Sequence, residues 1–414
     1  MPIITGLTGR IVFNSRGDTT VEVDITTDNK HLGRACAPSG ASVGKHEAQS
    51  FPHNNPSKAI DIFRSNAGKF IGIEASDPKI IFDVIRSIDG TASYGIVGGS
   101  IAYALSIAAV DSASKALDIP LVKVLRNDMP LRYPFPLGNI LGGGAHAGPG
   151  TPDIQEILVC PLGAKDILEA LKMNFKVHAE LRKVIESEDS SFTYGRGDEG
   201  AWAPRTNSEK AMEFVEQALG NLGFKIGEDV GLGIDFASSS LWNDNRQCYE
   251  YKREQLFRAR DEQIEYVNSL IKKYHLIYAE DPVQEEDFQG MAEITKKNRN
   301  CLVTGDDMLV TNRGRVTQAS EYNACSGAIL KVNQAGTLYD ALLFADECNR
   351  KGLKIVTSHR SGESVDSHIS HIAVATQSKM IKCGIVGGER IAKLNELVRL
   401  AEYDLIDGMA DLSF

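Results

Sequence analysis

The sequence has no CxxC pair, no long hydrophobic run and no excess of positive charge, and each absence excludes a class of protein. Its seven cysteines are odd in number and scattered along the chain, which fits reduced thiols and not a disulfide framework or a zinc site. The longest apolar stretches, such as residues 101–110, fall well short of the roughly 18 residues that a membrane span needs. A formal net charge of −10 argues against a nucleic-acid-binding surface.

The N-terminus also lacks the pattern of a secretion signal. Residues 1–5 have neither a basic region nor a cleavable apolar core, so the sequence shows no secretion signal. We therefore expect a cytoplasmic protein without a membrane or nucleic-acid partner. What is present is ordinary globular composition, with 42% hydrophobic and 24% charged residues. A chain of 414 residues is too long for one ordinary core, so we expect two domains.

The first part of the chain has the patterns of a small α+β domain. Residues 21–26 alternate between apolar and polar side chains, which predicts a half-buried strand that could pair with residues 11–13 as a hairpin. Residues 101–117 are rich in alanine and lack glycine and proline, which predicts a largely buried helix.

A cluster of prolines marks the expected domain boundary. Four of the 14 prolines lie between Pro120 and Pro136, and proline fixes φ and lacks an amide donor, so a domain can end there. We place the boundary near residue 130, with an α+β domain over residues 1–130 and a second domain over residues 131–414.

The second domain repeats one pattern, in which a short apolar or β-branched run ends in a polar residue and a helical stretch follows. Five such runs end at Asp235, Glu280, Asp306, Lys331 and His359. From Glu280 onward these ends are 26, 25 and 28 residues apart, which is the length of one βα unit, and several units in series make an α/β barrel. Because the C-terminal ends of barrel strands face one mouth, the five side chains are expected to converge there.

Three of these side chains are carboxylates, which would repel one another unless a cation lies between them. Ligation by oxygen alone suits a hard ion, and Mg²⁺ is the expected one. A second acid follows in two cases, at Asp281 and Asp307; alternation along a strand favours the first member of each pair, Glu280 and Asp306, as the ligand. One strand-end acid could equally cap the next helix, but three in succession with a lysine beside them favour a metal site.

Lys331 and the segment after the next predicted strand offer further chemistry. Lys331 ends an apolar run, and although it could simply reach solvent, an ammonium beside Mg²⁺ would be disfavoured, which prepares a neutral amine that can abstract a proton. Residues 358–363 read SHRSGE and combine His359, Arg360 and Ser361 with loop amides. That combination suits a phosphate or carboxylate; the alternative is a surface loop with a satisfied histidine.

Two glycine-flanked loops add candidate groups. Residues 141–152 read LGGGAHAGPGTP and hold His146, and their length suits a lid over a substrate, although a plain loop is equally consistent. Residues 196–204, RGDEGAWAP, carry Glu199. If this glutamate lies near Glu156, the two could act as an acid and its partner, with one pKa pushed upward by the other.

Together these motifs resemble those of the enolase family, in the same order from near residue 10 to near residue 400. The quoted segments are SRGDTTVE (15–22), APSGASVGKHEA (37–48), DIQE (153–156), GDEGAWAP (197–204), the three acids, LKVNQAGTL (330–338), SHRSGE (358–363) and ERIAKLNEL (389–397). The resemblance implies an α+β domain followed by an eight-stranded (β/α)8 barrel with a mixed sheet. It also implies the reversible dehydration of 2-phosphoglycerate to phosphoenolpyruvate, and a homodimer or higher homo-oligomer.

The resemblance also implies roles for single residues. Asp235, Glu280 and Asp306 would hold one Mg²⁺, and Ser42 would hold a second together with the substrate phosphate. Lys331 would remove the C2 proton, while Glu199, partnered by Glu156, would protonate the departing C3 hydroxyl. Lys393 and the metals would hold the substrate carboxylate and stabilise the charge that develops on it. The implied substrate-binding set is His146, Gln155, His359, Arg360, Ser361 and Lys393.

Several positions depart from the usual family pattern. Val43 stands where a threonine is typical, Ala201 replaces a glycine after GDEG, and Leu394 and Glu396 replace an aromatic residue and an amide. None of these is a proposed ligand or catalytic group, but they cluster around the expected mouth and its lids. An alternative is therefore a paralogue that uses the same chemistry on a related phosphorylated or phosphonate-containing acid. A second alternative is a non-catalytic binding protein on the same fold.

Overall fold

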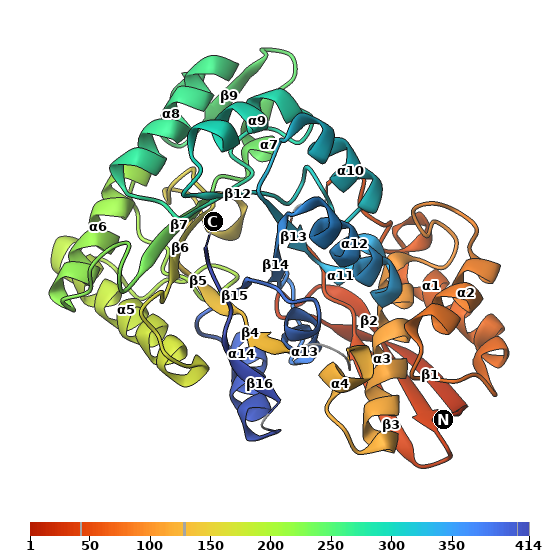
Figure 1. Cartoon of the computed structure of the whole chain (residues 1–414). Helices are drawn as coiled ribbons and strands as arrows, with labels where there is room; N and C mark the ends of the chain where they lie inside the picture. The colour runs from red at the N-terminus through yellow and green to blue at the C-terminus, as the bar shows by residue number, and fades with distance from the viewer. Residues whose placement is uncertain (42–43, 127–129, 404, 414) are drawn as a thin grey trace.

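The computed structural model describes residues 1–41, 44–126, 130–403 and 405–413. Its N-terminal part, coloured red to orange in Figure 1, lies against one side of a barrel that the rest of the chain forms. No helix among the described residues is long and apolar enough to cross a membrane.

The N-terminal part begins with an antiparallel sheet of three strands in chain order. These are β1 (Ile4–Phe13), β2 (Thr19–Thr27) and β3 (His31–Cys36). The predicted hairpin is confirmed, and its turn is held by Asn14, whose side-chain oxygen accepts two backbone N–H groups of the turn. Gly17 in that turn has φ +78°, a conformation that glycine adopts without steric cost.

Helix α3 (Gly99–Leu117) is the predicted buried helix, and its residues are buried along nearly its whole length. It packs against β2 and β3. A Cβ on Gly33 of β3 would lie 2.1 Å from the Ala108 carbonyl oxygen, so only glycine permits this close approach. The other helices of this part are α1 (Pro56–Asn66), α2 (Pro78–Ile88) and α4 (Leu121–Leu125), with short 3-10 turns η1 (Pro52–Asn54) and η2 (Ala67–Phe70).

The second part of the chain forms a closed eight-stranded barrel. Its second strand runs antiparallel to both neighbours, while all other neighbouring strands are parallel. The expected mixed barrel is therefore confirmed. In chain order the barrel strands are β5 (Phe135–Gly142), β6 (Glu156–Cys160), β7 (Gly231–Asp235), β11 (Tyr278–Glu280), β12 (Leu302–Gly305), β13 (Gly327–Leu330), β14 (Lys354–Ser358) and β15 (Met380–Gly384).

Helices form the outer layer of the barrel, as Figure 1 shows. They are α5 (Ile167–Glu188), α6 (Ser208–Asn221), α8 (Arg260–Lys273), α9 (Phe288–Lys297), α10 (Arg313–Tyr322), α12 (Leu338–Lys351), α13 (His368–Ala375) and α14 (Gly388–Leu400). Short elements complete the structure: α7 (Ser238–Leu241), α11 (Val332–Ala335), β4 (Leu131–Tyr133), β8 (Trp242–Asn243), β9 (Cys248–Tyr251), β10 (Leu256–Arg258), β16 (Ile406–Met409), η3 (Gly144–His146) and η4 (Ala401–Tyr403).

The barrel strands end where the sequence pattern predicted. Strands β7 and β11 end at Asp235 and Glu280, and Asp306, Lys331 and His359 directly follow β12, β13 and β14. Buried apolar side chains fill the barrel below these ends. The N-terminal part meets the same mouth, because backbone hydrogen bonds join the segments around residues 15 and 39 to the segment 362–363.

Candidate active site

One polar pocket at the barrel mouth brings most of the predicted site residues together. Its lining comprises Gly40, Ala41, Glu47, His146, Gln155, Glu156, Glu199, Asp235, Asp306, Asp307, Lys331, Ser358, His359, Arg360, Ser361 and Lys382. Glu280 is fully buried and bonded to the same lysine as Asp235. Ser42 lies outside the described residues, so its role stays a prediction. Its neighbours Gly40 and Ala41 line the pocket.

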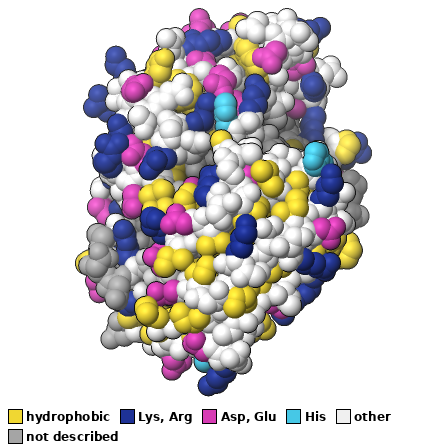
Figure 2. Space-filling view, turned by 90° about the vertical axis from the view of Figure 1, so that its right-hand side faces the viewer, with side chains coloured by type: hydrophobic (Ala, Val, Ile, Leu, Met, Phe, Trp, Pro, Cys, Tyr) yellow, Lys and Arg dark blue, Asp and Glu magenta, His cyan; other side chains and the backbone are white. Residues whose placement is uncertain are grey.

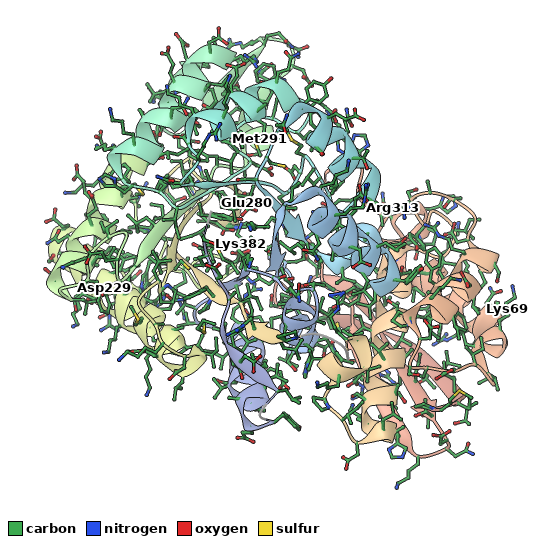
Figure 3. The ribbon with its side chains drawn as sticks, in the orientation of Figure 1. Lys69, Asp229, Glu280, Met291, Arg313 and Lys382 are labelled. Atoms are coloured by element: carbon green, nitrogen blue, oxygen red, sulfur yellow. The ribbon has the colours of Figure 1, made fainter. Side chains whose placement is uncertain are left out.

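A lysine that the sequence reasoning missed lies among the carboxylates. Lys382 projects from β15, and its Nζ is 2.7 Å from both Asp235 Oδ2 and Glu280 Oε2 and 3.2 Å from Glu156 Oε2. Figure 3 shows Lys382 and Glu280 in the middle of the barrel. Burial and the charge of Asp235 raise the pKa of Glu280 to about 8, while the surrounding carboxylates raise the pKa of Lys382 despite its burial.

The predicted base contacts a predicted metal ligand. Lys331 Nζ donates to Asp306 Oδ2, and Gln334 donates to the other carboxylate oxygen at 3.0 Å. Burial alone would lower the pKa of Lys331, but the surrounding carboxylates, Asp306 first and then Glu280, together raise that pKa. The lowering of the Lys331 pKa was expected beside Mg²⁺, and it stays a prediction. A neutral amine requires the negative charge of Asp306 to be compensated by another cation.

The second acid of each doubled pair has a different environment. Asp281 accepts the backbone N–H groups of Asp306 at 2.9 Å and Asp307 at 2.8 Å, so it holds the turn after β12. Oxygens of these three residues lie within 4.8 Å of one another, a spacing that could hold an ion. The predicted set of Asp235, Glu280 and Asp306 is not among the groups this tight in the described part of the chain. We still favour the set of Asp235, Glu280 and Asp306 as the metal ligands, because Asp281 already uses both carboxylate oxygens to accept backbone N–H groups.

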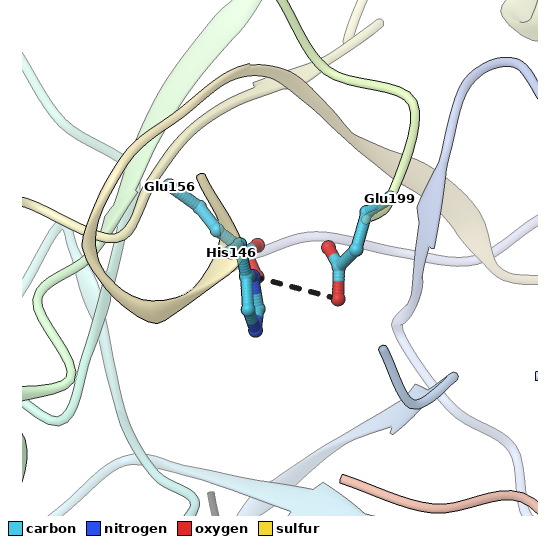
Figure 4. Close-up of side chains that lie close together, drawn as sticks. All are labelled: His146, Glu156 and Glu199. Atoms are coloured by element: carbon cyan, nitrogen blue, oxygen red, sulfur yellow. Dashed lines mark ion pairs between the residues drawn. The ribbon is translucent and has the colours of Figure 1, made fainter. Parts of the chain in front are cut away.

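A second group, His146, Glu156 and Glu199, lies close together in the same pocket (Figure 4). His146 Nδ1 is 3.1 Å from Glu156 Oε1 and 3.6 Å from Glu199 Oε1. Burial would lower the pKa of His146, but the two carboxylates outweigh it and raise that pKa to about 9. An imidazolium between two glutamates can pass a proton to either of them.

The two glutamates differ in proton affinity, as expected, because their environments differ. Burial, and then the charge of Glu199, raise the pKa of Glu156. Burial also acts on Glu199, but His359 and His146 outweigh it and hold the pKa of Glu199 well below its usual value. The glutamate whose pKa is raised is thus Glu156, the predicted partner, and not the predicted acid.

Glu199 is fixed by residues from three barrel elements. Its Oε2 accepts from Asn139 Nδ2 at 3.1 Å and lies 3.2 Å from His359 Nε2. A Cβ on Gly384, the last residue of β15, would lie 2.1 Å from the Glu199 carbonyl oxygen. Glycine at this strand end therefore lets the Glu199 loop lie directly on the barrel. Asn139 was not predicted, since a lone asparagine within a strand gives no signal.

The segment after β14 also lines the pocket. Arg360 is buried and pairs with Glu47 of the N-terminal part at 3.1 Å, and it donates to Asn333 at 3.1 Å. The Ser361 hydroxyl is buried and makes no hydrogen bond to the residues that the structure describes. A guanidinium beside a free hydroxyl can bind an anionic group of a ligand.

Lys393 does not reach the mouth, so its predicted place in the substrate site is wrong. Its amine donates to the carbonyl oxygens of Ser364 at 2.9 Å and Asp366 at 2.8 Å, and it pairs with Glu363 at 3.0 Å. These bonds tie α14 to the segment before α13. One further βα unit after His359 contains β15, and Lys382, 23 residues after His359, is the middle residue of that strand.

Comparisons with known proteins agree with this architecture. The family model for the enolase N-terminal domain matches residues 4–125, and the model for the enolase C-terminal TIM barrel domain matches residues 130–409. A protein named enolase from Methanosphaera stadtmanae is 44% identical over 405 residues, covering 97% of this chain and 98% of its own. Enolases from Methanothermobacter thermautotrophicus and Pyrobaculum aerophilum are 41% and 40% identical, covering 100% and 95% of this chain and 99% and 95% of their own.

Proposed function

Because the chain belongs to the enolase family, we propose that its barrel mouth catalyses the reversible dehydration of 2-phosphoglycerate to phosphoenolpyruvate. It is a hydro-lyase, and its substrate is a small phosphorylated acid. The observation that carries this proposal is that one pocket holds Lys331 together with the group of Glu199, Glu156 and His146. Such a pocket can take a proton from one carbon and protonate a leaving hydroxyl on the next.

We propose that Asp235, Glu280 and Asp306 hold a Mg²⁺ ion, and that Ser42 holds a second ion with the substrate phosphate. The donor set fits, because it consists of oxygens alone and Glu280 Oε1 is buried without a hydrogen-bond partner in the described part of the chain. In the enolase superfamily Mg²⁺ stabilises the charge that develops on the substrate carboxylate, which makes the C2 proton removable.

The residues of the chain then have distinct tasks. Lys331 in its neutral form takes the C2 proton. Glu199 holds the proton for the C3 hydroxyl, and because the pKa of Glu156 is the raised one, that proton reaches Glu199 through His146 between them. Lys382, in place of Lys393, supplies the ammonium group for the substrate carboxylate.

We propose that Gln155, Arg360 and Ser361 position the substrate, since all three line the pocket. Gln155 Nε2 lies 3.3 Å from Asp235 Oδ2. Arg360 and Ser361 offer the donors that a phosphate group needs.

The direct test is incubation of the protein with 2-phosphoglycerate and Mg²⁺, with ultraviolet absorbance reporting the conjugated enol phosphate. Product formation that requires Mg²⁺ and stops when a chelator is added supports the proposal. Turnover of a related phosphorylated or phosphonate acid in its place would favour the paralogue, and no turnover of any such acid would favour a binding protein. The family comparisons favour neither alternative.

The metal assignment predicts a specific loss in the Asp306→Asn variant. The substitution keeps the shape of the side chain but removes one of the charges that bind the cation. We expect the apparent affinity for Mg²⁺ to fall by more than the roughly 10- to 100-fold that the loss of an outer-shell partner costs. Calorimetry with Mg²⁺ and the Mg²⁺ dependence of turnover both measure it. Asp307→Asn, at the adjacent carboxylate, is the matched control with the smaller effect, and an unchanged affinity in Asp306→Asn would remove Asp306 from the ligand set.

We also propose that the protein is a homodimer or higher homo-oligomer. Phe13 and Val365 are 72% and 73% exposed, and each lies two residues from the backbone hydrogen bond between Ser15 and Glu363. Hydrophobic side chains are interspersed with charged ones on the face seen in Figure 2. Two large apolar side chains exposed near the same contact are expected to be covered by a partner.

The Phe13→Asp variant tests this interface. A charge in an apolar contact must be desolvated, so we expect the subunits to dissociate at protein concentrations where the unmodified protein stays assembled. Light scattering after size exclusion gives the mass of each species. Leu256→Asp, at another exposed apolar side chain, is the control. Equal masses for the unmodified protein and both variants would show that Phe13 is not in the interface.

We also propose that the protein is cytoplasmic. All seven cysteines are free, as expected in a reducing compartment.

A further inference from the structure

We propose that Arg390 is a positioning residue that fixes the tautomer of His359, so that a neutral imidazole presents its Nε2–H to Glu199 and the pocket. The inference rests on the proposed function only in treating Glu199 as the acid. Arg390 itself lies behind His359 and does not line the pocket.

Arg390 is the largest fully buried side chain among the described residues, at 0% exposure. It projects from α14 and donates to backbone carbonyl oxygens of three residues on two loops of the mouth. The acceptors are Arg360 at 2.7 Å, Ser361 at 2.8 Å and Asp198 at 3.1 Å. The nearest carboxylate oxygen with which it forms an ion pair belongs to Glu389, at 3.5 Å. A buried guanidinium with mostly neutral partners is costly, which calls for a reason beyond packing.

The fourth acceptor of Arg390 is the His359 ring. One terminal nitrogen of the guanidinium lies 2.9 Å from His359 Nδ1, and the Gly384 N–H points at the same ring nitrogen from 3.4 Å. A guanidinium has N–H donors only and stays protonated in proteins. Two donors therefore converge on Nδ1, which must offer its lone pair.

The proton of a neutral His359 is then on Nε2. That nitrogen lies 3.2 Å from Glu199 Oε2, and the His359 ring lines the pocket. Nε2 makes no aligned hydrogen bond to any of the described residues. Catalytic hydrogen bonds often align only once the substrate is bound. Burial and the charge of Arg390 together outweigh the charge of Glu199, and they lower the pKa of His359 to about 4. The ring therefore stays neutral.

The tautomer matters because it decides what Glu199 faces. A protonated His359 would place a full positive charge beside Glu199, whose pKa is already held low, and would further oppose the uptake of a proton that an acid needs. The other neutral tautomer would turn a lone pair toward the carboxylate and an N–H toward the guanidinium, which is unfavourable at both ends. Arg390 excludes both states with one side chain.

The test is ¹⁵N NMR of the full-length protein with labelled histidine. The His359 signals are identified by their loss in His359→Gln. At neutral pH we expect His359 to carry its proton on Nε2 alone; a proton on Nδ1, or on both nitrogens, would overturn the proposal. This spectrum needs no substrate and no variant of Arg390, so its outcome is independent of the proposed function.

Two substitutions separate positioning from packing. Arg390→Met removes the donor to Nδ1, and we expect the His359 signals to shift toward an average of both tautomers. We also expect slower dehydration, while C2 proton exchange is retained. Lys393→Met is the matched control, because Lys393 is also buried on α14 and donates to backbone carbonyls but is not bonded to His359. It should lower the melting temperature and leave the tautomer unchanged. An unchanged tautomer in a folded Arg390→Met protein contradicts the proposal, and if that variant does not fold, the spectrum of the unmodified protein decides.

Discussion

Replacing Lys331 with alanine is expected to abolish exchange of the C2 proton of 2-phosphoglycerate with solvent. Turnover should fall by at least the roughly 10²- to 10⁴-fold that a positioned general base contributes. The amine lies at the end of β13, bonded to Asp306, and so faces the proposed metal site. A cation bound at Asp306 would offset the carboxylate charge that now raises the Lys331 pKa. The base and the metal ligand are in this way one functional unit.

The exchange is measured by NMR in deuterated water with Mg²⁺ present. Lys354→Ala is the matched control, since Lys354 begins β14 at the opposite end of the barrel and lies outside the pocket lining. That variant should exchange the C2 proton at the normal rate. Normal exchange in Lys331→Ala would show that another group is the base.

The barrel could be predicted from the sequence because its information is local and periodic. Five apolar runs end in a polar residue, and from Glu280 onward these ends are 25 to 28 residues apart. Since parallel strands of a barrel open into one mouth, this pattern predicted that Asp235, Glu280 and Lys331 lie together. The buried helix α3 was predictable for a similar reason, because alanine without glycine or proline favours a helix.

The contacts across the mouth could not be predicted, because they join distant segments. Arg360 meets Glu47 from the N-terminal part, and Glu199 meets Asn139 from β5. Lys393 stands in a motif that resembles the family, but its amine bonds to backbone carbonyls and not to the mouth. Motif matching identifies a segment, and only the structure shows where a long side chain points.

Proton affinities are a further property that the sequence does not contain. The proximity of Glu156 and Glu199 predicted that one pKa would be raised, without saying which. The answer depends on His359, which lies 3.2 Å from Glu199, and on the different charges around each carboxylate.

The Glu199→Gln variant should separate proton removal at C2 from loss of the C3 hydroxyl. We expect the variant to retain C2 proton exchange while loss of the C3 hydroxyl falls by about 10²- to 10⁴-fold. The amide oxygen can still accept from Asn139, which bonds Glu199 Oε2 at 3.1 Å in this structure, so the loop should keep its position. What is lost is only the proton that the carboxyl group can deliver.

The two rates are measured on one sample, exchange by NMR and dehydration by ultraviolet absorbance. Asp198→Asn is the control, because its carboxylate pairs with Arg16 at 3.0 Å and is not part of the pocket lining; both rates should persist. If Glu199→Gln lost exchange and dehydration together, Glu199 would act before or during proton removal and not as the acid of the second step. A selective loss of dehydration places the base and the acid on different residues, as the proposed roles of Lys331 and Glu199 require.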